Sequence, residues 1–128
     1  MPHKLLDAAT PADSRETERF IALVADKLTA TDRLFRECLA SDVPFIQKSG
    51  EYIFDGGGKR MRPALLLLCA RLLDRDGEEE VTYAAVVELI HTATLVHDDI
   101  LDESGMRRQV ETVNRRVGNE TAVLLGDY

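Results

Sequence analysis

The chain has 128 residues, of which 45% are hydrophobic, 30% are charged and 5% are aromatic. This length suits one domain or part of one, and the formal net charge of −7 argues against a general nucleic-acid-binding surface. The chain opens without a basic-flanked apolar run, and the longest apolar run, 64–70, is too short to span a bilayer. Cys38 and Cys69 stand singly, which predicts buried free thiols in a reducing cytosol.

The first half of the chain predicts an arm followed by helices. Residues 1–13 contain two prolines and no clear period, so we expect a flexible N-terminal arm, with 14–128 forming part of a single domain. From Ser14, apolar residues at three- and four-residue spacing predict one helix up to the break at Pro44. A second helix is expected at about 45–54. Three glycines end it, and Pro63 suits the first turn of the next helix.

The second half predicts a long helix over 81–102, a polar loop over 103–116 and a further helix from Asn119. No segment alternates apolar and polar residues at period two, so the fold class is all-α, an antiparallel helical bundle. The helix from Pro63 and the helix over 81–102 are apolar nearly all round, which predicts buried, central helices. Covering them needs more protein, so we expect only the N-terminal half of a bundle.

Three aspartates gather at the end of the helix over 81–102, in "HDDILD". Asp98 and Asp102 share a helix face, His91 lies on that face two turns earlier, and Asp99 lies about 100° round. A helix C-terminus disfavours anions, so carboxylates there favour a bound cation. Mg²⁺ suits such a site because it takes few protein carboxylates and keeps waters or phosphate oxygens. The alternative is a solvated helix end.

Basic residues stand in two places that suit phosphate binding. Arg107 and Arg108 follow the aspartates, and arginine binds phosphate bidentately. The alternative for them is an ion pair with Asp102 or Glu103. In "GGGKRMRP", an open glycine backbone precedes Lys59, Arg60 and Arg62 and a helix N-terminus, a combination that favours anions. The alternative is a flexible hinge with solvated cations.

The segments "GGGKRMRP", "LIHTATLVHDDILDESGMRR" and "GNETAVLLGDY", in this order and spacing, resemble the N-terminal part of trans-type isoprenyl (polyprenyl) diphosphate synthases. The resemblance covers about residues 15–128. It implies the all-α isoprenoid synthase fold, a homodimer or a complementing subunit, and a Mg²⁺-dependent prenyltransferase. Such an enzyme condenses isopentenyl diphosphate with an allylic diphosphate.

Carried over by position, the resemblance implies a role for each matching residue. Metal binding falls to Asp98 and Asp102 of the DDxxD motif, with Asp99 in support, and all three are expected to be catalytic. Arg107 is expected to contact the allylic diphosphate. The diphosphate of isopentenyl diphosphate is expected to bind Lys59, Arg62, His91 and Arg108.

The resemblance also bears on product length. Small residues, Ala93 and Thr94, occupy the turn before the DDxxD motif, where a bulky aromatic residue stops elongation early in this family. A medium- or long-chain product is therefore expected. The alternative is that Ala93 only packs the helix.

The chain departs from the family pattern in two ways. Gln109 stands where the family usually has glycine, and the second aspartate-rich motif is absent. We therefore expect the 128 residues alone to be inactive, as part of a larger synthase. The alternative is a small non-catalytic or regulatory subunit of a heteromeric synthase. A cytoplasmic location without a membrane span is expected, with an isoprenoid product that associates with membranes.

Overall fold

The structure is a computed structural model that describes residues 11–56, 58–107 and 109–128. Most of the described residues are helical. The helices are α1 (Pro11–Ala22), α2 (Ala25–Leu39), α3 (Pro44–Asp55), α4 (Met61–Leu72), α5 (Glu79–Leu101), α6 (Val113–Val117) and α7 (Asn119–Asp127), and a two-residue hairpin joins β1 (Met106–Arg107) to β2 (Val110–Glu111). The predicted all-α class is confirmed.

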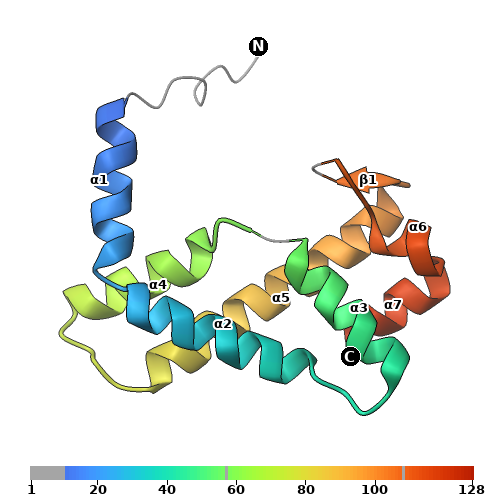
Figure 1. The fold of residues 1–128 in the computed structure, drawn as a ribbon, viewed down its shortest axis with the longest axis horizontal. Coiled ribbons are helices and arrows are strands. Elements are labelled where there is room, and N and C mark those ends of the chain that lie inside the picture. The colour runs from blue at the N-terminus through green and yellow to red at the C-terminus, as the bar shows by residue number, and fades with distance from the viewer. Residues whose placement is uncertain (1–10, 57, 108) are drawn as a thin grey trace.

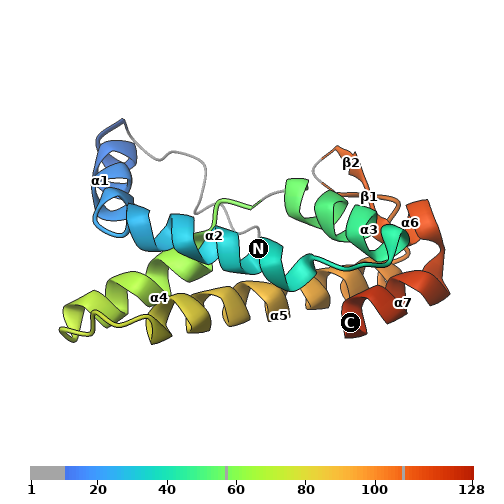
Figure 2. The same cartoon turned by 60° about the horizontal axis from the view of Figure 1, so that its bottom comes forward.

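Helix α5 is the central element of the fold. It packs against α2, α4, α6 and α7, and in Figure 1 it runs across the molecule with α2 and α4 along one half and α3, α6 and α7 along the other. Turned by 60°, the helices separate into an upper layer of α2 and α3 and a lower layer of α4, α5 and α7 (Figure 2). Helix α1 stands away from both layers in each view.

Two small apolar clusters hold the layers together. Val24, Leu67 and Ala84 join the start of α2 to α4 and α5. Val96, Val113 and Ala122 join α5 to α6 and α7, with residues of α3 packed against them. Burial of these side chains is the main stabilising term, and the second cluster fixes the end of α5 that carries the aspartates.

The N-terminal helix predicted from Ser14 is two helices in the structure. The N–H groups of Leu23 and Val24 donate to carbonyls three residues back, each at 3.1 Å, and this tightened turn ends α1. Helix α1 begins at Pro11, because proline suits a first helical turn. It therefore takes in the last residues of the predicted arm. Residues 1–10 of that arm lie outside the described residues.

The predicted loop over 103–116 contains secondary structure. Met106 pairs with Glu111 and Arg107 with Val110, in an antiparallel hairpin, and α6 follows. Strands of two residues are too short to show a period in the sequence, so the pattern could not reveal them.

Two predictions about burial are wrong. Cys38 and Cys69 are exposed rather than buried. Helix α4 buries Pro63, Ala64 and Leu67 but leaves Leu65 63% exposed and Leu72 82% exposed. Only one face of this apolar helix is therefore covered by the described residues. No helix in the described part of the chain is long and apolar enough to cross a membrane.

Candidate functional site

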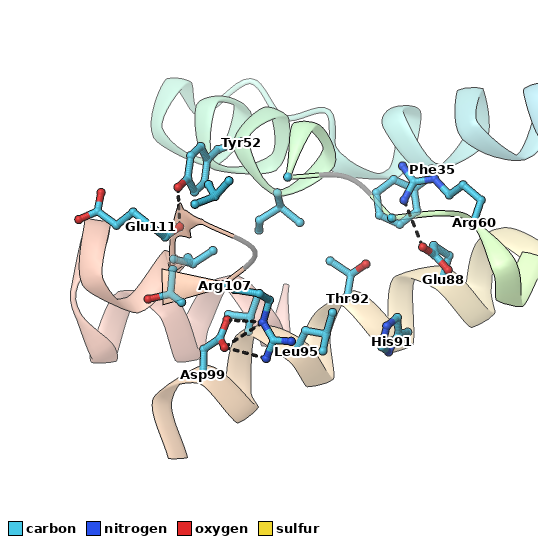
Figure 3. A pocket seen from close by; sticks show the side chains of 17 residues that line it. Phe35, Tyr52, Arg60, Glu88, His91, Thr92, Leu95, Asp99, Arg107 and Glu111 are labelled. Atoms are coloured by element: carbon cyan, nitrogen blue, oxygen red, sulfur yellow. Dashed lines mark hydrogen bonds and ion pairs between the residues drawn. The ribbon is translucent and has the colours of Figure 1, made fainter. Parts of the chain in front are cut away.

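One face of α5 lines a pocket beneath α3 and the hairpin. His91, Thr92, Leu95, Val96 and Asp99 contribute to its wall. Tyr52 and Ile53 of α3, Gly58 of the glycine-rich segment and Val110 to Val113 complete it. Figure 3 shows an ion pair at each end: Arg107 with Asp99 at one, and Arg60 with Glu88 at the other. The pocket therefore joins the two sequence segments that were expected to bind phosphate.

Asp99 is a buried carboxylate that is ion-paired with Arg107. Asp99 is only 5% exposed, and it accepts from the Arg107 guanidinium through both oxygens, at 2.8 Å between Nη2 and Oδ1 and 3.2 Å between Nε and Oδ2. This forked arrangement is the strong bidentate form. The hydrogen bonds that Arg107 donates to Asp99 raise the pKa of Arg107 above its ordinary value, and the charges of Asp98 and Asp102 act in the same direction. Arg107 pairs with Asp99, and not with Asp102 or Glu103 as the alternative interpretation supposed.

The hairpin that carries Arg107 is itself anchored to α3. The Tyr52 hydroxyl donates to the Glu111 carbonyl at 2.5 Å. The guanidinium of Arg116 lies 4.2 Å from the centre of the Tyr52 ring, which is cation–π contact. Thr112 is buried and its hydroxyl donates to the Ser104 carbonyl at 2.7 Å. Sequence reasoning missed Tyr52, because its partners lie far along the chain.

Asp98 and Asp102 differ from Asp99 in exposure and in pairing. Both are exposed, and neither carboxylate is hydrogen-bonded or ion-paired to another described residue. Asp98 lies in the last turn of α5 and Asp102 caps the C-terminus of that helix, one turn further on. Both offer hard oxygen ligands at exposed positions, so the donor set suits Mg²⁺ completed by water and substrate oxygens. Across residues 11–56, 58–107 and 109–128, no group of three or more His, Cys, Asp or Glu is placed to hold a metal ion.

The basic segment before α4 divides into exposed and buried cations. Lys59 and Arg62 are exposed. Arg60, which the sequence groups with them, is turned inward: its Nε donates to Asp32 at 2.7 Å and its Nη1 to Glu88 at 3.1 Å. Lys59 and Arg62 are therefore the cations of this segment that can reach a ligand.

The remaining predicted site residues lie along α5 or outside the described chain. His91 lines the pocket and is partly buried. Ala93 and Thr94 do not line it, and the Thr94 hydroxyl donates to the His91 carbonyl at 2.7 Å. Arg108 lies outside the described residues.

A glycine of α7 fits closely against the aspartate-bearing helix. A Cβ added at Gly126 would lie 2.7 Å from Cδ2 of the His97 ring. That ring is held by a contact of 3.2 Å between Nε2 and the Val123 carbonyl. The close approach explains the glycine in "LLGDY", and it ties α7 to the residue that precedes Asp98.

Comparison with known proteins identifies the class to which this fold and site belong. The family model described as polyprenyl synthetase matches residues 43–128, and the chain belongs to this family. It is 46% identical over 111 residues to octaprenyl diphosphate synthase of Escherichia coli, covering 87% of this chain and 34% of that protein. Identity to the all-trans-nonaprenyl-diphosphate synthase of Rhodobacter capsulatus is 42% over 112 residues.

Solved structures agree. The fold matches a decaprenyl diphosphate synthase from Rhodobacter capsulatus with a TM-score of 0.82 and 43% identity, over 87% of this chain and 34% of that one. It matches a polyprenyl synthase from Caulobacter crescentus, complexed with calcium and isoprenyl diphosphate, with the same TM-score and 37% identity, over 86% and 34% of the two chains. The chain spans about a third of the length of the relatives it matches.

Proposed function

We propose that these residues form the first part of a Mg²⁺-dependent prenyltransferase that condenses isopentenyl diphosphate with an allylic diphosphate. The main observation is the pocket, which is lined by Arg107 and Asp99 at one end and by Gly58 and Arg60 at the other. Asp98 and Asp102 are neighbours of Asp99 in the sequence, and Lys59 and Arg62 are neighbours of Arg60, but none of these four residues lines the pocket itself. Two anionic groups could be held there a short distance apart. Membership of the polyprenyl synthetase family supports this assignment.

Asp98 and Asp102 are proposed to hold the metal ion, because both are exposed and neither carboxylate is hydrogen-bonded or ion-paired to another residue that the structure describes. When bound, Mg²⁺ would supply charge neutralisation for the departing diphosphate. A relative crystallised with calcium and isoprenyl diphosphate is consistent with a divalent cation in this role. Asp99 is proposed to support the site through Arg107, which it holds, rather than as a metal ligand.

The cations are proposed to divide between the two substrates. Arg107 contacts the allylic diphosphate at the aspartate end. Lys59, Arg62 and His91 bind the diphosphate of isopentenyl diphosphate, and Arg108 is assigned the same role from its position in the sequence. These assignments place fixed positive charge where the two anions must sit, and this is the arrangement that electrostatic catalysis requires.

The chemistry follows from charge stabilisation. The allylic C–O bond breaks and the diphosphate leaves with the electron pair. The double bond of isopentenyl diphosphate attacks the allylic carbon, a C–C bond forms, and a proton passes to the released diphosphate. Arg107 stabilises the departing oxygens, and Leu95, Val96 and Ile53 in the pocket wall exclude water from the cation.

The product is proposed to be a medium- or long-chain trans-polyprenyl diphosphate. Ala93 and Thr94 leave the turn before the DDxxD motif without a bulky aromatic side chain. Relatives named octaprenyl, nonaprenyl and solanesyl diphosphate synthases favour a long product. The predicted homodimer or complementing subunit, the cytoplasmic location and the membrane-associated product stay predictions.

The test is elongation of a labelled allylic primer by isopentenyl diphosphate, using the complete gene product in Mg²⁺, with product length read by chromatography. Replacing Asp98 or Asp102 by Asn should lower kcat/KM by at least about 100-fold. The reason is that a weakened metal site would no longer neutralise the negative charge of the diphosphate, either in the bound substrate or in the transition state. Asp42→Asn, an exposed aspartate between α2 and α3, is the matched control. Full activity in excess chelator would contradict the proposal, and turnover by residues 1–128 alone would contradict the expected inactivity of this part.

A further inference from the structure

Arg60 makes several side-chain contacts beside the pocket. It is 17% exposed, and its guanidinium lies between the carboxylates of Asp32 on α2 and Glu88 on α5. The same group lies 4.8 Å from the ring centre of Phe54 and 5.3 Å from that of Phe35. One side chain therefore joins α2, α3 and α5 to the segment that precedes α4 (Figure 3 shows its Glu88 contact).

The backbone at Arg60 is unusual. Its φ of 50° places it in the left-handed region, which residues other than glycine seldom adopt. Such conformations persist where surrounding contacts over-determine them. Here the two ion pairs and two ring contacts hold the side chain, so they also hold the backbone turn. Lys59 precedes this turn immediately, and Arg62 follows it by two residues.

The contact with Glu88 links this turn to a pocket residue. Glu88 and His91 are three residues apart on α5, so they lie on neighbouring positions of one helix face. Glu88 is itself buried, with 8% of its side chain exposed, and the helix that carries it, α5, packs against α2 and α4. The Arg60–Glu88 bond therefore sets the position of Lys59 and Arg62 relative to His91.

We infer that Arg60 is a positioning residue for the isopentenyl diphosphate subsite: it does not touch the substrate, but it fixes the turn that presents Lys59 and Arg62 opposite His91. This rests on the proposed function. Sequence position alone would assign Arg60 to the phosphate, as one of three neighbouring cations. Because Arg60 is largely buried and is paired with two carboxylates of the protein, its charge is directed at those carboxylates and not at a substrate diphosphate.

The first test compares Arg60→Lys with the wild-type complete gene product. Lysine keeps the positive charge, so the electrostatic field on the subsite is preserved, but an ammonium cannot reproduce the planar fork between two carboxylates. Binding of isopentenyl diphosphate alone, without primer or turnover, is measured by calorimetry. We expect the Kd for isopentenyl diphosphate to rise roughly 10- to 100-fold over that of the wild type, the size of effect that misplaced binding groups produce. The KM for the allylic primer should stay within about threefold of the wild-type value, because Arg107 is anchored by other contacts.

Arg36→Lys is the matched control. Arg36 also stacks on Phe54, with 3.8 Å between guanidinium and ring centre, but it belongs to α2, and among the described residues Asp32 and Glu88 are ion-paired to Arg60 and not to Arg36. It should leave both substrates unaffected. Should Arg60→Lys fail to fold, Glu88→Gln serves as the second variant, because it keeps the shape of the side chain and weakens only the link to α5.

The outcomes separate this inference from the proposed function. Wild-type protein that neither binds isopentenyl diphosphate nor elongates a primer would overturn both. Wild-type binding with an unchanged Kd in the lysine variant, or an equal loss for both substrates, would overturn the positioning role and leave the function standing. A selective loss for isopentenyl diphosphate supports it.

Discussion

At the level of single residues, the DDxxD motif contains two kinds of aspartate. Asp98 and Asp102 are exposed, whereas Asp99 is buried and bound to Arg107 through both of its oxygens. Helix geometry predicts that Asp99 points away from the other two, but not what it meets there. Its partner lies in a hairpin that the sequence pattern does not show. The motif therefore combines a proposed metal site with an anchor for an arginine.

Replacing Asp99 by Asn should test this anchor. Hydrogen bonds to charged groups contribute about 1.5–3 kcal/mol, but Arg107 is 40% exposed and its pairing is partly screened. We therefore expect about 1 kcal/mol lower stability in denaturant unfolding, together with a raised KM for the allylic primer. Glu103→Gln, which removes a neighbouring exposed charge, should change neither. An Asp99→Asn variant that loses activity through kcat alone would point to a metal ligand instead.

What the sequence predicts at residue level depends on whether a residue acts locally. The spacing of Asp98, Asp102 and His91 on one helix could be read directly, because α-helix geometry is regular. Arg60 and Tyr52 could not be interpreted in this way. Arg60 pairs with Asp32 and Glu88, each 28 residues away along the chain. Tyr52 bonds to Glu111, which is 59 residues away. Nothing in the local sequence distinguishes Arg60 from the exposed Lys59 and Arg62.

At the level of elements, the helices were predictable and their junctions were not. Apolar periodicity located α3, α5 and α7 to within a few residues. The break between α1 and α2 and the hairpin of β1 and β2 have no periodic signature, since each involves only a few residues. Gly126 could not be interpreted from the sequence either. A glycine inside a helix does not reveal which side chain lies against it, and only the packing of α7 on α5 shows that this is His97.

Gly126→Ala tests how closely α7 packs on α5. In a helix interior, alanine is favoured over glycine by about 0.8–1 kcal/mol, so stability should rise if the position has room. The structure predicts the opposite sign, because a Cβ at Gly126 would collide with the His97 ring. We expect a loss of about 1–3 kcal/mol in denaturant unfolding, as for other overpacked sites.

The His97→Ala background supplies the control for this prediction. With the imidazole removed, Gly126→Ala should become neutral or stabilising. In a double-mutant cycle, the double variant should therefore be more stable than the sum of the two single-substitution effects would give. If Gly126→Ala is equally harmful with and without the ring, the contact with His97 is not the reason for the glycine.

For the whole molecule, the all-α class followed from the sequence, but the extent of burial did not. An apolar helix predicts a buried helix only if other elements surround it. In the structure, α2 and α5 cover one face of α4, and Met61, Leu65 and Leu72 remain exposed at positions that share the other face. Tyr83, Val86 and Ile90 form a similar exposed stripe on α5. Periodicity cannot show how many neighbours a helix has.

These two stripes predict how residues 1–128 behave when produced alone. Large exposed apolar surfaces drive association, so we expect concentration-dependent oligomers in sedimentation velocity and strong binding of a hydrophobic dye. Charged residues at two of these positions, Leu65→Lys with Leu72→Glu, should shift the protein toward monomer without loss of helical circular dichroism, because neither side chain contributes to the buried clusters. Arg33→Glu, on the exposed side of α2, should leave association unchanged. If unaltered residues 1–128 stay monomeric and bind no dye, the stripes of α4 and α5 are not exposed in solution.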